Sequence, residues 1–169
     1  MTAAAETEVD RASALCLSCG LCCSGGLFDY VELDDEDRTR FGEAGLSSPD
    51  RLPLLRPHFI SSACSVYAIR PWRCSDYRCR VLDAHVAGDI DAPGAHSLVE
   101  QAKAMRALVD DALPPGLTAR QLAQDVRSQA PQSRDPPRLL ALARFVAYRL
   151  FVERHFLGPK SRWMTKTKA

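Results

Sequence analysis

Long apolar runs are missing from this sequence. No hydrophobic segment approaches the ~20 residues that a membrane-spanning helix needs. The first residues, MTAAAETEVDRASA, include acidic side chains and no apolar core, which is not the pattern of a secretory signal. Charge of one sign is not in excess either, because 22 basic residues nearly balance 21 acidic ones. We therefore expect a cytoplasmic protein that binds neither membranes nor, by general electrostatic attraction, nucleic acid.

Motifs that would identify an enzyme are also missing. The sequence has no glycine-rich loop for a nucleotide or S-adenosylmethionine, and its serines and histidines form no spaced catalytic triad. The basic residues near the end, from Lys160 to Lys168, are not arranged as a recognition helix. The sequence therefore predicts no catalytic residue, favours a binding protein over an enzyme, and makes a nucleic-acid partner unexpected.

Cysteine is present in excess, and all of it lies in the first half of the chain. Seven cysteines occur among 169 residues, four of them within the motif CLSCGLCC at residues 16–23. An odd number of thiols without an export signal is a poor match to a disulfide framework, which stays the alternative. Thiolates bind zinc and iron strongly, so the clustered spacing favours a metal site.

The spacing within this first block suggests how its thiols divide. Cys16, Cys19 and Cys22 recur every third residue, and a tight turn would let them converge on one metal. The three glycines of residues 20–26 would supply the positive φ angles of such a turn. Cys23 directly follows Cys22, and neighbouring side chains diverge. We therefore expect Cys23 to face a second centre, shared with a downstream block.

That downstream block is CSVYAIRPWRCSDYRC, which contains Cys64, Cys74 and Cys79. Together with CLSCGLCC it resembles the CxxCxxCC (YkgJ-type) family of zinc- or iron-chelating domains. The family pattern is C-x-x-C-G-x-C-C followed by C-x-x-Y-x-x-R-P-x-x-C-x-x-x-x-C. The resemblance covers residues 16–80 and implies a small metal-binding domain, mostly bacterial, whose biochemical role is poorly defined. Flagellin lysine methylases contain a similar cluster in a longer chain.

One position departs from the family pattern. Members usually carry another cysteine shortly before the one aligned with Cys64, and this sequence has His58 there. Imidazole also binds zinc and iron well. The resemblance therefore implies eight ligands, enough for two tetrahedral sites. The candidate metal ligands are Cys16, Cys19, Cys22, Cys23, His58, Cys64, Cys74 and Cys79.

The same set of ligands bears on the charge around the site and on the metal that it would hold. Six arginines and one acid occur between residues 51 and 80, and these guanidinium groups would offset the charge of clustered thiolates. A solvated basic face is the alternative. We expect one or two zinc or iron ions in a structural or regulatory role. The alternatives are an iron–sulfur redox protein, because C-x2-C-x2-C resembles part of a ferredoxin motif, and an accessory subunit of a modifying enzyme such as a methylase.

The expected fold is a mainly α, small and irregular metal-stabilised domain. We predict a flexible tail at residues 1–15, a cysteine-cluster region at 16–88, a helical region of the same domain at 89–158 and a basic tail at 159–169. The cysteine-rich half, mostly loop, would pack on about three C-terminal helices.

Capping patterns locate the expected helices. Asp34 caps a short helix that ends at Gly42 or Gly45, and a further short helix ends at Gly88. The three C-terminal helices begin with a capping box at Ser97, a second box at Thr118 and the prolines of residues 136–137, respectively. Residues 27–33 are expected to form a strand. The third helix is rich in apolar residues, most of them expected in the core, and a protein partner on its face is the alternative.

Overall fold

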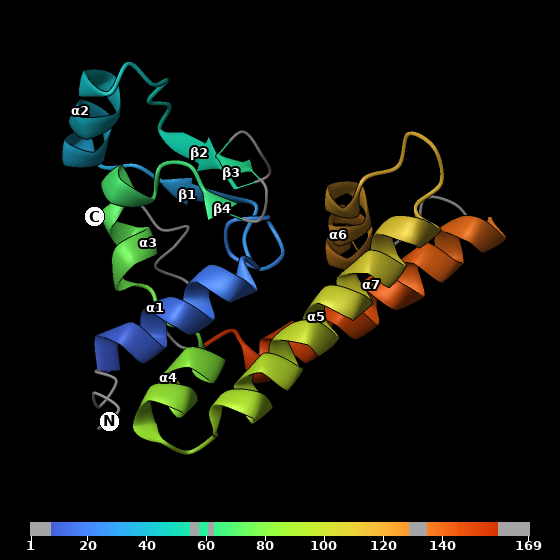
Figure 1. Ribbon diagram of the computed structural model, residues 1–169. Helices are drawn as coiled ribbons and strands as arrows, with labels where there is room; N and C mark the ends of the chain where they lie inside the picture. Colours follow the sequence, from blue (N-terminus) through green and yellow to red (C-terminus); the bar gives the residue numbers. More distant parts are fainter. Residues whose placement is uncertain (1–7, 55–57, 61–62, 129–134, 159–169) are drawn as a thin grey trace.

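The structure, a computed structural model, is mainly α-helical, as the sequence predicts (Figure 1). It describes residues 8–54, 58–60, 63–128 and 135–158. The predicted basic tail at 159–169 and residues 1–7 lie outside the described residues. Within the described ranges, no helix is long and apolar enough to cross a membrane. The elements are α1 (Glu8–Cys19), β1 (Tyr30–Glu32), α2 (Asp35–Glu43), β2 (Arg51–Pro53), β3 (Phe59–Ile60), β4 (Ala63–Cys64), η1 (Tyr67–Ile69), α3 (Trp72–Asp76), α4 (Arg80–Ala87), α5 (Ala92–Ala112), α6 (Ala119–Ser128) and α7 (Pro136–His155).

The cysteine-rich half contains more regular structure than the sequence predicts. Helix α1 already begins at Glu8, so the prediction of a flexible tail to residue 15 is wrong from Glu8 onward. Leu15 of this helix is buried in the core, which gives the segment a packing partner that local propensity does not reveal. Two antiparallel strand pairs, β1–β2 and β3–β4, replace part of the expected loops.

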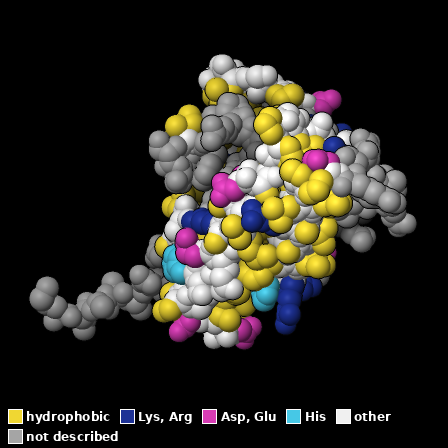
Figure 2. All heavy atoms as spheres, turned by 90° about the vertical axis from the view of Figure 1, so that its right-hand side faces the viewer, with side chains coloured by type: hydrophobic (Ala, Val, Ile, Leu, Met, Phe, Trp, Pro, Cys, Tyr) yellow, Lys and Arg dark blue, Asp and Glu magenta, His cyan; other side chains and the backbone are white. Residues whose placement is uncertain are grey.

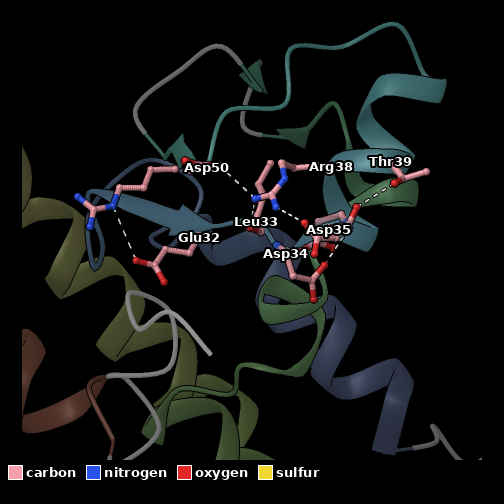
Figure 3. Close-up of polar contacts among 9 residues, drawn as sticks. Glu32, Leu33, Asp34, Asp35, Arg38, Thr39 and Asp50 are labelled. Atoms are coloured by element: carbon pink, nitrogen blue, oxygen red, sulfur yellow. Dashed lines mark hydrogen bonds and ion pairs between the residues drawn. The ribbon is translucent and has the colours of Figure 1, made fainter. Parts of the chain in front are cut away.

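Helix α2 begins as its sequence predicts and is held firmly against the strands. The Asp34 carboxylate accepts a hydrogen bond from the Asp37 N–H at 2.9 Å, completing a capping box. Arg38 donates to the Leu33 carbonyl at 3.0 Å and to Asp50 at 3.2 Å, and it also pairs with Asp35. Figure 3 shows Arg38 between these partners, and Arg38 therefore links α2 to the segments that flank β1 and β2.

The C-terminal half consists of the predicted helices, with one corrected boundary. Figure 1 shows α5 and α7 running antiparallel side by side, with α6 next to their far end. The Thr118 box and the proline start of α7 are confirmed. The start of α5 at Ser97 is wrong, because Asp91 caps the helix earlier by accepting a hydrogen bond from the Gly94 N–H at 2.8 Å.

Helix α7 supplies much of the core and also an apolar surface. Phe145, Tyr148 and Val152 are buried, as expected for a core helix. Leu139, Leu140 and Leu150 instead stay exposed, with relative accessibilities of 40%, 50% and 62%. Figure 2 shows hydrophobic side chains gathered on the side of the molecule formed by the C-terminal helices. A protein partner for this face stays a prediction.

Candidate metal centre

The first cysteine block is built from the end of a helix and a tight turn. Cys16 and Cys19 lie three residues apart in the last turn of α1, so they share one face of that helix. The helix stops there because Gly20 adopts a φ of 66°, and the following turn carries Cys22 and Cys23. The prediction of positive φ angles is confirmed for Gly20 and for Gly25, whose φ is 74°.

Gly26 is required for a different reason from the one predicted. It is not among the glycines with positive φ. A Cβ atom at this position would instead lie 2.9 Å from the Leu21 carbonyl oxygen and 2.9 Å from the Tyr148 hydroxyl. The backbone of the cysteine turn therefore packs against α7 at a distance that no larger residue permits.

Three side chains of the C-terminal helices hold the first block in place. The ammonium group of Lys103 donates to the Ser18 carbonyl at 2.9 Å, near the C-terminal end of α1. Arg106 donates to Gly25 at 3.3 Å, and the buried Tyr148 hydroxyl donates to Gly26 at 2.8 Å. These contacts fix the cysteine turn to α5 and α7 without using any thiol.

The second cysteine block comes from three separate elements. Cys64 lies on β4, Cys74 on α3, and Cys79 at the N-cap position of α4. Helix α3 is anchored by Asp37 of α2, whose carboxylate is fully buried and accepts a hydrogen bond from the Trp72 N–H at 3.0 Å. The sequence does not reveal this role of Asp37, because a carboxylate in the first turn of a helix is normally exposed at the surface.

All eight predicted ligand positions line two adjoining cavities. The larger cavity measures about 230 Å³ and is lined by Cys16, Cys22, Cys23, His58, Cys64 and Cys74, among others. The smaller one measures about 40 Å³ and is lined by Cys16, Cys19, Cys22, Cys23 and Cys79. The fold thus collects thiols from α1, the following turn, β4, α3 and the start of α4 into one region.

The first group of neighbouring thiols is Cys16, Cys19, Cys22 and Cys79. Burial raises the pKa of the Cys22 thiol well above its usual value, and the nearby Cys79, Cys16 and Cys19 raise it further. Burial likewise raises the pKa of Cys79 to about 12, again with contributions from Cys19 and Cys16. Backbone N–H groups oppose this trend, because Leu21 donates to the Cys19 sulfur and Leu82 to the Cys79 sulfur.

The second group is Cys23, Cys64 and Cys74. It adjoins the first group, because Cys16 and Cys19 also contribute to the raised pKa of Cys23. Burial raises the pKa of Cys23 to about 12, and Cys64 contributes both through its charge and through a side-chain hydrogen bond. The pKa of Cys74 is also raised to about 12. Burial is the main cause, and the charges of Cys23 and Cys64 raise it further. The second group therefore combines one thiol of the first sequence block with two thiols of the downstream block.

His58 lines the larger cavity with the second group and directly precedes β3. Its carbonyl accepts a hydrogen bond from the Ser65 N–H at 2.8 Å, whereas Cys64 pairs with residue 59. The His58 ring lies edge-on to the ring of Phe41, with centroids 6.1 Å apart.

Arg70 supplies positive charge to both groups. It lowers the pKa of the Cys16 and Cys74 thiols, against the larger effect of burial. Its guanidinium carbon lies 3.9 Å from the centroid of the Tyr67 ring, and it donates to the Tyr67 carbonyl at 3.2 Å. Other arginines of the basic stretch have other contacts, since Arg51 pairs with Glu32 at 3.7 Å.

The thiols are gathered but not yet arranged as ligands. All seven are free, so the disulfide alternative finds no support in the structure. Among the described residues, no three Cys, His, Asp or Glu side chains already have the spacing of a metal site. Protonated thiols of high pKa have no reason to approach more closely. A metal would have to displace their protons and draw the sulfurs together.

Comparison with protein-family models, with curated proteins and with solved structures found no significant match. The resemblance to the CxxCxxCC family therefore depends on the two cysteine motifs themselves.

Proposed function

We propose that this protein binds zinc or iron through its clustered cysteines, in a structural or regulatory role. The observation that supports it most is the arrangement of the seven thiols, which come from five parts of the fold and line two adjoining cavities. Thiols that serve only as small hydrophobic residues have no reason to collect in this way.

The chemistry of the donors fits these metals. An all-sulfur set of neighbouring thiols suits zinc, and it also suits iron. The raised pKa values show that the region opposes several negative charges when no cation is present. A divalent cation would remove this penalty by neutralising the thiolates. The N–H groups that donate to Cys19 and Cys79 would then stabilise the bound thiolates.

The grouping of the thiols supports two centres. Cys16, Cys19, Cys22 and Cys79, which line the smaller cavity, would give one ion the four thiolates of a closed, structural site. Cys23, Cys64 and Cys74 would hold a second ion with three thiolates. The family resemblance adds His58 as an eighth ligand, and this assignment stays a prediction.

Metal and acid-labile sulfide analysis per chain tests the proposal. Protein purified without added metal should carry close to two ions per chain, with no sulfide. Cys79→Ser and Cys74→Ser should each lose about one ion, because they belong to different groups. His96→Ala, on the exposed side of α5, is the matched control and should keep both ions. Folded protein that takes up no zinc or iron even when both are supplied in excess would contradict the proposal.

An iron–sulfur centre is the second candidate, supported by the first group. A C-x2-C-x2-C run completed by a remote cysteine, here Cys79, is the ligand pattern of such clusters. Anaerobically purified protein would then be brown, contain sulfide in proportion to iron, and lose its visible absorbance on reduction with dithionite. Colourless protein with bound zinc would decide for the first candidate.

A further inference from the structure

The exposed face of α7 carries an apolar stripe whose side chains have the same order in both directions along the helix. The stripe consists of Leu140, Ala143, Ala147 and Leu150, at spacings that place them on one face. All four residues are exposed, and the two leucines keep relative accessibilities of 50% and 62%. Contiguous exposed apolar side chains, unlike scattered single ones, are typical of an interaction site.

The symmetry of the stripe indicates which partner covers it. A two-fold axis lets one residue of a chain contact a second residue in another copy, and the reverse contact then forms as well. In an antiparallel pair of α7 helices, Leu140 of each copy meets Leu150 of the other, and Ala143 meets Ala147. A partner of unrelated sequence would give no reason for this symmetry. We propose that α7 pairs with α7 of a second copy of this chain, in an antiparallel homodimer.

The side chains of the stripe suit such a pairing. The two alanines lie at its centre, so they allow the helix axes to approach closely, while the leucines at both ends supply most of the apolar contact. Because the contact spans only about three turns of helix, we expect a reversible dimer of roughly micromolar affinity.

The fold holds α7 in a position that leaves the stripe available. The opposite face of the helix is buried in the core through Ala141, Phe145, Tyr148 and Val152. Arg144, a charged residue near the centre of the stripe in sequence, donates to the Leu108 carbonyl of α5 at 2.9 Å, which draws its guanidinium to that helix. The pairing uses no thiol, so it does not depend on the proposed metal binding.

Charges at the two ends of α7 complement each other in the same arrangement. Asp135 is the N-cap residue and Arg154 lies in the last turn, and both are exposed. When Leu140 faces Leu150, Arg154 of each copy lies next to Asp135 of the other. A parallel pair would instead bring like charges together. The charges therefore favour the antiparallel arrangement.

Sedimentation equilibrium with charge substitutions tests the proposal. The parent chain should form a dimer that dissociates on dilution. Leu140→Lys and Leu150→Glu should each raise the dissociation constant by roughly a hundredfold, because the symmetry repeats each uncompensated charge at two places in the interface. The double variant should form dimers again, since each new lysine then faces the new glutamate of the other copy. Leu17→Glu is the matched control, because Leu17 is a comparably exposed leucine, at 49%, on α1.

The outcomes decide both the partner and its direction. A parent chain that stays monomeric up to about 1 mM would overturn the proposal. A dimer that Leu150→Glu leaves intact would do the same, because its interface would lie elsewhere. A double variant that stays dissociated would refute the antiparallel arrangement. Circular dichroism of each variant confirms that it is folded.

A chelator separates this inference from the proposed function. Metal-free protein should keep the dimer, since α5 and α7 pack on each other without any thiol. Loss of the dimer together with the metal would place the interface in the cysteine-rich half and contradict the inference. A protein that binds no metal but still forms the dimer would refute only the proposed function.

Discussion

In the C-terminal half, α5 and α7 run side by side and bury Val99, Val109, Tyr148 and Val152 almost completely. In the cysteine-rich half, short helices and two-residue to three-residue strands surround two cavities lined by thiols. Packing of long helices can stabilise the first region on its own. The second also buries an apolar core, which includes Val31, Leu33 and Phe41, but its thiols line cavities beside that core. The two halves therefore differ in these thiol-lined cavities, and metal binding there stays a prediction.

Removal of the metal should have the largest effect, and it should destabilise the cysteine-rich half far more than the C-terminal half. Structural zinc contributes on the order of 10 kcal/mol to small zinc domains, so a chelator should unfold much of the cysteine-rich half. Hydrogen exchange should then show lost protection in α1, α3 and α4, while α5 and α7 stay protected. Equal protection of both halves with and without the chelator would show that the thiols do not stabilise the fold through a metal.

The zinc affinity should increase with pH, whereas the stability of the metal-free fold should decrease with pH. The thiols of Cys23, Cys74 and Cys79 have pKa values raised to about 12, so metal binding must release protons. Zinc affinity should therefore rise more than tenfold per pH unit between pH 6.5 and 8.5, measured by competition with a chelating dye.

Without metal, stability should instead fall as the pH increases. The folded state keeps these protons between the ordinary thiol pKa, near 9, and the raised pKa, so the unfolded state binds fewer protons there. The stability contributed by the protonated thiols is complete below pH 9 and decreases above it. Urea unfolding of the metal-free protein at pH 7.5 and pH 10 measures this change. Higher stability at pH 10 would contradict the assigned pKa shifts.

Asp37→Ala should weaken the second thiol group without removing a thiol. It leaves the Trp72 N–H without its carboxylate acceptor, which costs about 1–3 kcal/mol in a buried position, and releases α3. The matched control is Asp35→Ala, because Asp35 lies in the same helix with its side chain almost entirely exposed. Urea unfolding and metal stoichiometry should both change in the first variant and stay near the parent values in the second.

Gly26→Ala should have a smaller effect, centred on the junction between the halves. The added methyl group would collide with the Leu21 carbonyl and the Tyr148 hydroxyl, at a cost of about 1–3 kcal/mol. Gly42→Ala is the control, because nothing lies within 4 Å of its new methyl group and α2 favours alanine over glycine there. Thermal unfolding should show a loss for the first substitution and a small gain for the second.

The features that the sequence predicted correctly are local. The caps at Asp34, Gly88 and Thr118 are confirmed, because each depends on residues within one helical turn. The start of α5 was misplaced because two capping patterns follow each other, and Asp91 provides the earlier one. Helix α1 was missed from Glu8 because its stability comes from the burial of residues such as Leu15 in distant elements.

In the candidate site, too, only the features that are local in the sequence could be predicted. The spacing of the cysteines identified them as a set and predicted that Cys23 shares a centre with the downstream block. It did not reveal that Cys79, and not Cys64 or Cys74, lines the smaller cavity with Cys16, Cys19 and Cys22. Three-dimensional neighbours of this kind depend on where α3 and α4 are placed. The role of Asp37 was hidden for the same reason, since its partner Trp72 is 35 positions away.

The hydrogen bond between Tyr148 and Gly26 also has a consequence for the order of folding. Its two residues are 122 positions apart, so the contact forms only after α7 has been synthesised and has closed a very long loop. During synthesis the first four thiols leave the ribosome long before the residue that holds their turn. For that interval CLSCGLCC is a set of accessible thiols in an unfinished chain. Oxidation of this segment is therefore expected to be easier during that interval than after the last helix is in place.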